Sequence, residues 1–142
     1  MALATLGFDE LRASQIAAAE GSTPGAARPR ALGRAYIRFA CQNPNMYRLM
    51  FGEAITDWRK HPLAASAKRR CFEPVQAVIA GDPGLRQGQG VQTAGSCYVG
   101  AWALVHGLAM LIIDGTFQEE LSADDIDDDL IARILQGLAG AF

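Results

Sequence analysis

The sequence has few lysines and a net charge close to zero. Lys60 and Lys68 are the only lysines, so arginine supplies nearly all of the 13 basic residues. These stand against 15 acidic residues, which gives a net charge of -2 and a pI of about 5.6. A domain that neutralises nucleic-acid phosphates is strongly basic. The chain by itself is therefore not expected to bind DNA or RNA.

Cysteine is scarce too, with Cys41, Cys71 and Cys97 far apart in the sequence. An odd number of cysteines without a C-x-x-C pair predicts neither a disulfide framework nor a zinc site. The first residues, MALATLGFDEL, lack the basic and apolar regions of a signal peptide. We expect a cytoplasmic protein that holds no metal.

Catalytic motifs are missing as well. There is no G-x-S-x-G or H-E-x-x-H, and Gly88-Gln-Gly90 lacks the strand that a phosphate-binding loop requires. The acidic residues between Asp124 and Asp129 suit the start of a helix, where they complement its dipole, better than a metal site. His61 and Cys71 show no sign of forming a dyad. A small helical enzyme is thus only an alternative, and no cofactor is expected.

The residues that are present predict one all-α domain over residues 1–142. Half of the residues are hydrophobic, they recur at helical spacing, and no segment alternates like a strand. Leu3, Leu6, Phe8, Leu11 and Ile16 follow this spacing imperfectly, which predicts a short or partial first helix. Helices are expected within residues 1–20, 29–52 with a break at Asn43-Pro44, 62–80 with a kink or division at Pro74, 91–114, and 123–138 capped by Ser122; residues 81–90 form a loop.

Ala94 to Ile113 form an apolar-rich run without a formal charge. It could span a membrane, hold a ligand or form the central buried helix of a bundle. No Lys or Arg flanks it to anchor a membrane span, and Asp114 follows at once, so a central helix is favoured. Some residues of this run recur at alternating steps of four and three, as in left-handed helix packing, and we call them the seam. The small residues Gly100, Ala103 and Gly107 would let another backbone approach. The seam residues are Ala94, Tyr98, Ala101, Val105, Leu108 and Ile112.

Three blocks carry a family resemblance: RALGRAYIRFA at residues 30–40, NPNMYRLMF at 43–51 and AWALVHGLA at 101–109. Together they resemble the C-terminal domain of tetracycline-repressor-like (TetR/AcrR) bacterial regulators, in the branch named for its Trp, His and Gly. The resemblance extends from about Leu3 to Leu138. The Ala, Gly and Arg richness is also typical of a GC-rich bacterial genome.

The resemblance implies an effector-binding domain that forms a homodimer. Residues 1–20 would end the connecting helix, 29–52 and 62–80 would be pocket helices, and 91–114 and 123–138 would pair with their copies in a four-helix bundle. Such regulators begin with a helix-turn-helix domain of about 50 residues. Nothing here corresponds to it, so DNA binding is expected of a parent protein, of which this chain is a fragment or a product with a missing start.

The resemblance also suggests which residues contact an effector, a small apolar or aromatic molecule, and which contact a second subunit. The candidate pocket residues are Tyr36, Phe39, Cys41, Met46, Tyr47, Met50, Phe51, Phe72, Val75, Ile79, Trp102 and His106. The candidate dimer residues are the six seam residues between Ala94 and Ile112, together with Ile126, Leu130, Ile134 and Leu138.

Two alternatives stay open at this point. The pocket residues would equally describe an ordinary core, with His106 bonded to a carbonyl or carboxylate rather than to a ligand. A helical dimerisation module without any effector would use the same seam.

Overall fold

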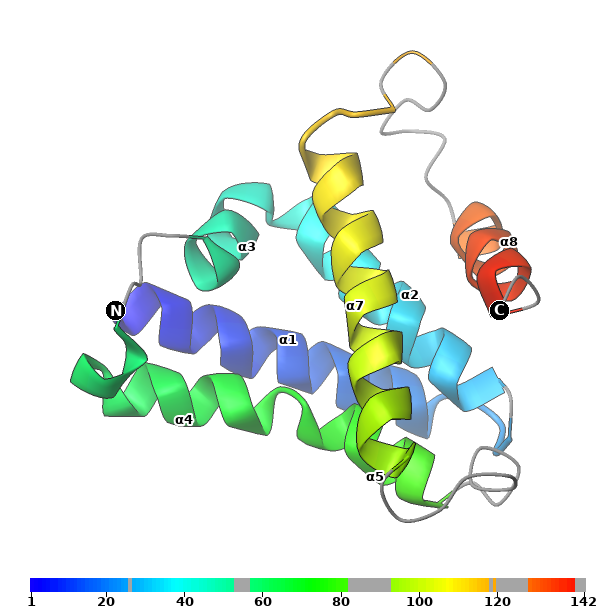
Figure 1. Ribbon diagram of the computed structural model, residues 1–142, viewed down its shortest axis with the longest axis horizontal. Coiled ribbons are helices and arrows are strands. Elements are labelled where there is room, and N and C mark those ends of the chain that lie inside the picture. The colour runs from blue at the N-terminus through cyan, green and yellow to red at the C-terminus, as the bar shows by residue number, and fades with distance from the viewer. Residues whose placement is uncertain (26, 53–56, 82–92, 118, 120–127, 140–142) are drawn as a thin grey trace.

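The computed structural model describes residues 1–25, 27–52, 57–81, 93–117, 119 and 128–139, and in these parts the ordered elements are helices (Figure 1). The α-helices are α1 (Ala2–Glu20), α2 (Ala27–Gln42), α3 (Pro44–Phe51), α4 (Pro62–Arg70), α5 (Glu73–Gly81), α7 (Thr93–Ile113) and α8 (Asp128–Ala139). A 3-10 turn, η1 (Trp58–Lys60), precedes α4. The chain therefore has the all-α fold that its spacing predicts.

The helices pack around α1 and α2. α1 contacts α2 and α4 along its length, α7 packs across α2, and α8 lies against α2 as well. Figure 1 shows α1 and α4 running side by side, with α7 passing over α2. The core lies where α1, α2, α3 and α7 meet.

α2 buries the face that its sequence predicts. Leu32, Tyr36, Phe39 and Ala40 are all less than a tenth exposed, and their helical spacing places them on one face. Its partners from α1, Phe8 and Leu11, are completely buried. Burial of such side chains stabilises the fold by about 1.5–3 kcal/mol each.

α1 is a full helix of 19 residues, so the expectation of a short or partial first helix is wrong. Leu3 and Leu6, which seemed to belong to its apolar stripe, are 52% and 50% exposed. The buried face instead includes Ala4, Gly7 and Gln15. The spacing of the large apolar residues is imperfect because three of the five buried residues of α1 are small or polar.

Two prolines mark the breaks that they predict. Pro44 occupies the first turn of α3, where its missing N–H is not needed. Pro74 is the second residue of α5, and α4 ends at Arg70, so the predicted 62–80 helix is divided rather than kinked. The break falls at Cys71 and Phe72 because Pro74 has no N–H to donate to the carbonyl of Arg70, four residues before it.

α7 is less enclosed than the expected central helix. Of its described side chains Ala109 is fully buried, whereas Val99 and Leu111 are 55% and 42% exposed. No helix in the described parts of the chain is both long enough and apolar enough to cross a membrane. Ser122 and most of the acidic run lie outside the described residues, as does the loop beyond Gly81.

Candidate functional site

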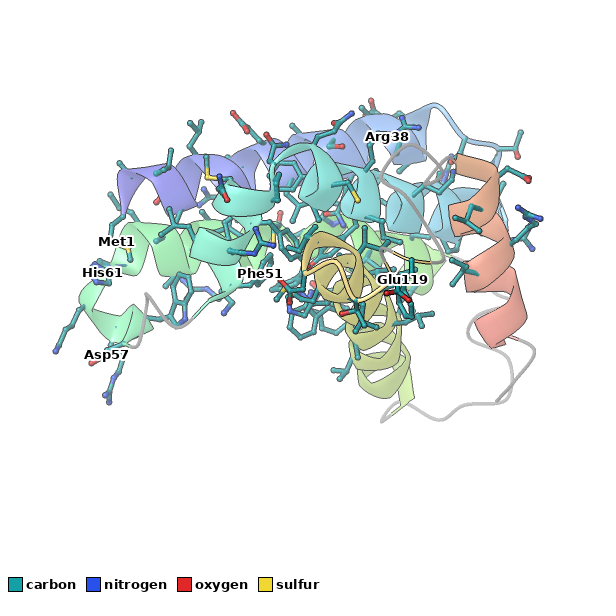
Figure 2. All side chains as sticks on the ribbon, turned by 90° about the horizontal axis from the view of Figure 1, so that it is seen from above. Met1, Arg38, Phe51, Asp57, His61 and Glu119 are labelled. Atoms are coloured by element: carbon teal, nitrogen blue, oxygen red, sulfur yellow. The ribbon has the colours of Figure 1, made fainter. Side chains whose placement is uncertain are left out.

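Five ring-bearing side chains from three helices meet beside α7, and we refer to them as the aromatic cluster. They are Tyr36 of α2, Tyr47 and Phe51 of α3, and Trp102 and His106 of α7. Figure 2 shows Phe51 close to the α7 ribbon, where the side chains gather. The cluster brings together five of the predicted pocket residues.

Local sequence explains why these rings converge. Trp102 and His106 are four residues apart and therefore lie on one face of α7, where their rings stack with centroids 4.8 Å apart. Tyr47 and Phe51 repeat that spacing on α3. Because the chain breaks at Asn43-Pro44, α3 turns this face toward α7, and the Phe51 and His106 centroids are also 4.8 Å apart.

Three polar atoms form a triangle within the cluster. His106 Nδ1 lies 2.6 Å from the Tyr47 hydroxyl oxygen and 3.0 Å from that of Tyr36. The Tyr47 hydroxyl donates to the Tyr36 hydroxyl over 2.9 Å. With the ring proton of neutral His106 on Nε2, Nδ1 accepts from one hydroxyl while the other hydroxyl donates to its neighbour. The partners of His106 are tyrosine hydroxyls, not the carbonyl or carboxylate that the sequence suggested.

Burial favours the uncharged forms of the three groups in the triangle. It raises the pKa values of Tyr36 and Tyr47 above those of a free tyrosine. It also lowers the pKa of His106, and the positive charge of Lys68 lowers it further. Each shift favours the neutral form because the interior solvates charge poorly.

The indole nitrogen of Trp102 is buried and makes no hydrogen bond with the described residues. Its N–H is near enough to Tyr36 to lower the pKa of that phenol, against the larger effect of burial. The indole ring meets Phe72 edge to face at 5.5 Å, and Phe72 meets Tyr98 in the same way at 5.8 Å. The indole ring therefore packs on aromatic side chains, while its N–H lies near the Tyr36 hydroxyl without forming a regular hydrogen bond.

The other predicted pocket residues join the same core or its edge. Phe39, Met50 and Ile79 are buried, and Met46 and Phe72 pack against the buried cluster. Cys41 and Val75 are half-buried. Contact of any of these residues with a ligand stays a prediction.

The predicted dimer residues lie in varied surroundings. On α7, Ala101 is exposed and Leu108 and Ile112 are half-buried, while Val105 packs against the chain's own core and Tyr98 contacts Phe72. On α8, Leu130 and Ile134 are half-buried. Ile126 and the side chains of Ala94 and Leu138 are outside the described parts of the structure.

Gly100 and Gly107 have open space beside them. A Cβ atom added to either would meet nothing within 4 Å. Within the described parts of this chain, then, no backbone approaches the small-residue stripe. The close contact predicted there would have to come from elsewhere.

Neither Cys71 nor His61 is placed for catalysis. The Cys71 thiol is buried, donates to the Lys68 carbonyl over 3.0 Å, and has its pKa raised by burial to about 12, so it stays protonated. His61 precedes α4 and lies near the N-terminus in Figure 2. The helix between them separates their backbones by about 15 Å at 1.5 Å per residue.

These features define the chain as an all-helical domain whose interior holds neutral, hydrogen-bonded aromatic groups. A family model described as the tetracyclin repressor-like, C-terminal domain matches residues 30–138. The chain belongs to this family, which confirms the resemblance of the three sequence blocks. Its members are regulatory rather than enzymatic domains and generally dimerise and bind small effectors. A search among curated proteins found no significant match.

Proposed function

We propose that this chain is the ligand-sensing and homodimerisation domain of a bacterial TetR-type transcriptional regulator in the cytoplasm. A small apolar or aromatic effector would modulate DNA binding by a helix-turn-helix domain that is not part of this sequence. The family match over residues 30–138 carries the proposal, because it includes α3, α4, α5, α7 and nearly all of α2 and α8.

The aromatic cluster is the proposed point of effector contact. Trp102 supplies a buried donor without a partner, and an unpaired buried donor costs about 1–3 kcal/mol. A ligand carbonyl or hydroxyl oxygen would remove that cost, while its apolar body packs on Phe72 and Tyr98. The effector would bind two arrangements of the helices unequally, and the shift would pass to α1.

The second subunit is proposed to cover α7 and α8. Val99 and Leu111 expose large apolar side chains on α7, and Gly100 and Gly107 leave room for a close backbone. The predicted residues Ala101, Leu108 and Ile112 lie on the same helix. Exposed apolar side chains gathered on one element are typical of a protein interface.

Thermal unfolding with chosen probes tests the sensing role. Acetophenone and ethylbenzene are similar in shape, but acetophenone alone offers a carbonyl oxygen. We expect acetophenone to raise the melting temperature with concentration, more than ethylbenzene does. Trp102→Phe, which keeps an aromatic ring and loses the N–H, should remove the difference between the probes.

Equal effects of both probes on the wild-type protein would contradict the role of Trp102. If neither these probes nor decanol stabilises the protein, sensing at the cluster is wrong. A dimer seen by light scattering would then favour the alternative, a helical dimerisation module without effector. A monomer at micromolar concentration would contradict both functions.

A further inference from the structure

An open space lies apart from the aromatic cluster. It is a cavity of about 470 Å³ between the C-terminal end of α1, the turn that leads into α2, and α5. No residue of the aromatic cluster lines it. Its size is within the range of small-molecule sites, roughly 300–1,000 Å³.

The cavity lies between two largely apolar helix faces in which several residues are small. α5 presents Pro74, Ala77, Val78 and Gly81, which recur at the three- and four-residue steps of a single helix face. Opposite them α1 presents Ile16 and Ala19. Alanine and glycine are too short to fill the space between the helices, so its walls are apolar but do not meet.

Arg28, in the first turn of α2, lines the same cavity. Its side chain is half-buried, and its Nε is enclosed without a hydrogen-bond partner among the described residues. An enclosed guanidinium nitrogen that bonds to nothing is costly, since buried polar groups are normally paired. The cavity therefore contains an unused, charged donor.

Glu20, the other charged residue that lines the cavity, does not pair with Arg28. It is exposed at the end of α1, and no ion pair joins it to Arg28 among the salt bridges of the described residues. A guanidinium binds a carboxylate through two parallel hydrogen bonds, which is the strongest pairing open to it. The missing partner is thus best supplied by a carboxylate from outside the chain.

We propose that this cavity binds a small monocarboxylic acid with an apolar body, whose carboxylate accepts hydrogen bonds from Arg28. The apolar body lies between the Pro74–Gly81 face of α5 and Ile16 of α1. This site is distinct from the proposed effector contact at Trp102, and the proposal holds whether or not an effector binds there.

Calorimetric titration with matched probes tests the proposal. 4-Isopropylbenzoate and octanoate carry the carboxylate, and 4-isopropylbenzamide is the neutral counterpart of the first. We expect 4-isopropylbenzoate to bind at least about tenfold more tightly than the amide, because only the acid forms a charge-assisted pair. Titration should also shift the Nε–H resonance of Arg28 in ¹⁵N NMR spectra.

Variants separate the site from general charge effects. Arg28→Met should abolish the preference for the acid, whereas Arg30→Met, which changes an exposed arginine two residues along, should retain it. Ala77→Phe should fill the cavity and weaken binding of acid and amide alike. Circular dichroism shows whether each variant is folded, and the NMR shift tests the wild-type protein even where a variant is not.

Three results would overturn the proposal. They are equal affinity for acid and amide, unchanged acid binding in folded Arg28→Met, and no binding of either acid at millimolar concentration. Because Trp102→Phe leaves this cavity intact, it should bind the acid as the wild type does. Loss of acid binding in that variant would place the acid at the aromatic cluster instead.

Discussion

His106 occupies a position where protonation is costly. Its Nδ1 accepts from a tyrosine hydroxyl, and a protonated ring would lose that lone pair while bringing a charge into an apolar interior near Lys68. The sequence placed His106 beside Trp102 correctly, since the spacing of four residues fixes that relation. It did not identify the tyrosines as partners, although a buried tyrosine hydroxyl usually requires one and Tyr36 and Tyr47 were both expected in the interior.

Lowering the pH should destabilise the protein through His106. The folded-state pKa of His106 lies below its ordinary value of 6.5, so between these two values the unfolded chain binds the additional proton. The stabilisation is complete above about pH 6.5 and is lost as the pH falls toward the folded-state pKa. Urea unfolding of the wild type and His106→Phe at pH 7.5 and 5.0 measures this effect.

At pH 7.5 we expect His106→Phe to be less stable by about 1–3 kcal/mol, because a tyrosine hydroxyl loses its acceptor. The difference between the two proteins should shrink at pH 5.0. Comparing them cancels the other titrating groups. A difference that stays constant with pH would show that protonation of His106 does not affect folding.

At the scale of the elements, the ends of helices are fixed by a few specific residues. Pro44 and Pro74 could be read from the sequence because proline limits which neighbours are helical. The full length of α1 could not, because Gln15 is buried and Leu3 is exposed, contrary to their hydrophobicity. The cavity was also missed, since its lining comes from three segments far apart in the sequence and has no common spacing.

Arg48 of α3 binds the C-terminal end of α7. It donates to the carbonyl oxygen of Ile113 and pairs with Asp114 at 3.2 Å. A positive side chain there donates to a carbonyl at the helix end and interacts favourably with the negative end of the helix dipole. Arg48 therefore joins the short helix that carries Tyr47 and Phe51 to the helix that carries Trp102 and His106.

Replacing Arg48 with Met should reduce the free energy of unfolding by about 1–2 kcal/mol through loss of the hydrogen bonds to α7. Hydrogen exchange of amides at the end of α7 should become faster in the same variant. Arg69→Met changes an exposed arginine of α4 and should stay within about 0.5 kcal/mol of the wild type. Equal stability of the two variants would mean that Arg48 contributes nothing beyond a surface charge.

At the scale of the whole molecule, α7 has two different faces. One packs rings into the core, and another exposes Leu111 with open space beside Gly100 and Gly107. The seam was predicted from spacing alone, yet Val105 and Tyr98 turn out to serve the chain's own core. Spacing identifies a stripe on a helix but not which neighbour covers it.

Gly107→Leu tests the exposed face. Because the added side chain enters open space within the chain, and leucine favours helix over glycine by about 0.8 kcal/mol, the monomer should remain folded. A second subunit packed closely there would clash, so we expect the dimer to dissociate at least about tenfold more readily in analytical ultracentrifugation. Ala13→Leu, on the exposed side of α1, is the control. An unchanged dimer in Gly107→Leu would exclude this face as the interface.

Two ion pairs bind α1 on either side of the break between α4 and α5. Arg70, at the end of α4, pairs with Asp9, and Glu73, at the start of α5, pairs with Arg12, each at 3.0 Å. α1 thus connects α4 and α5 across the break at Cys71 and Phe72. A bend at this break would change the distance in at least one of the two pairs, and because their side chains are partly exposed, each pair resists such a movement only weakly.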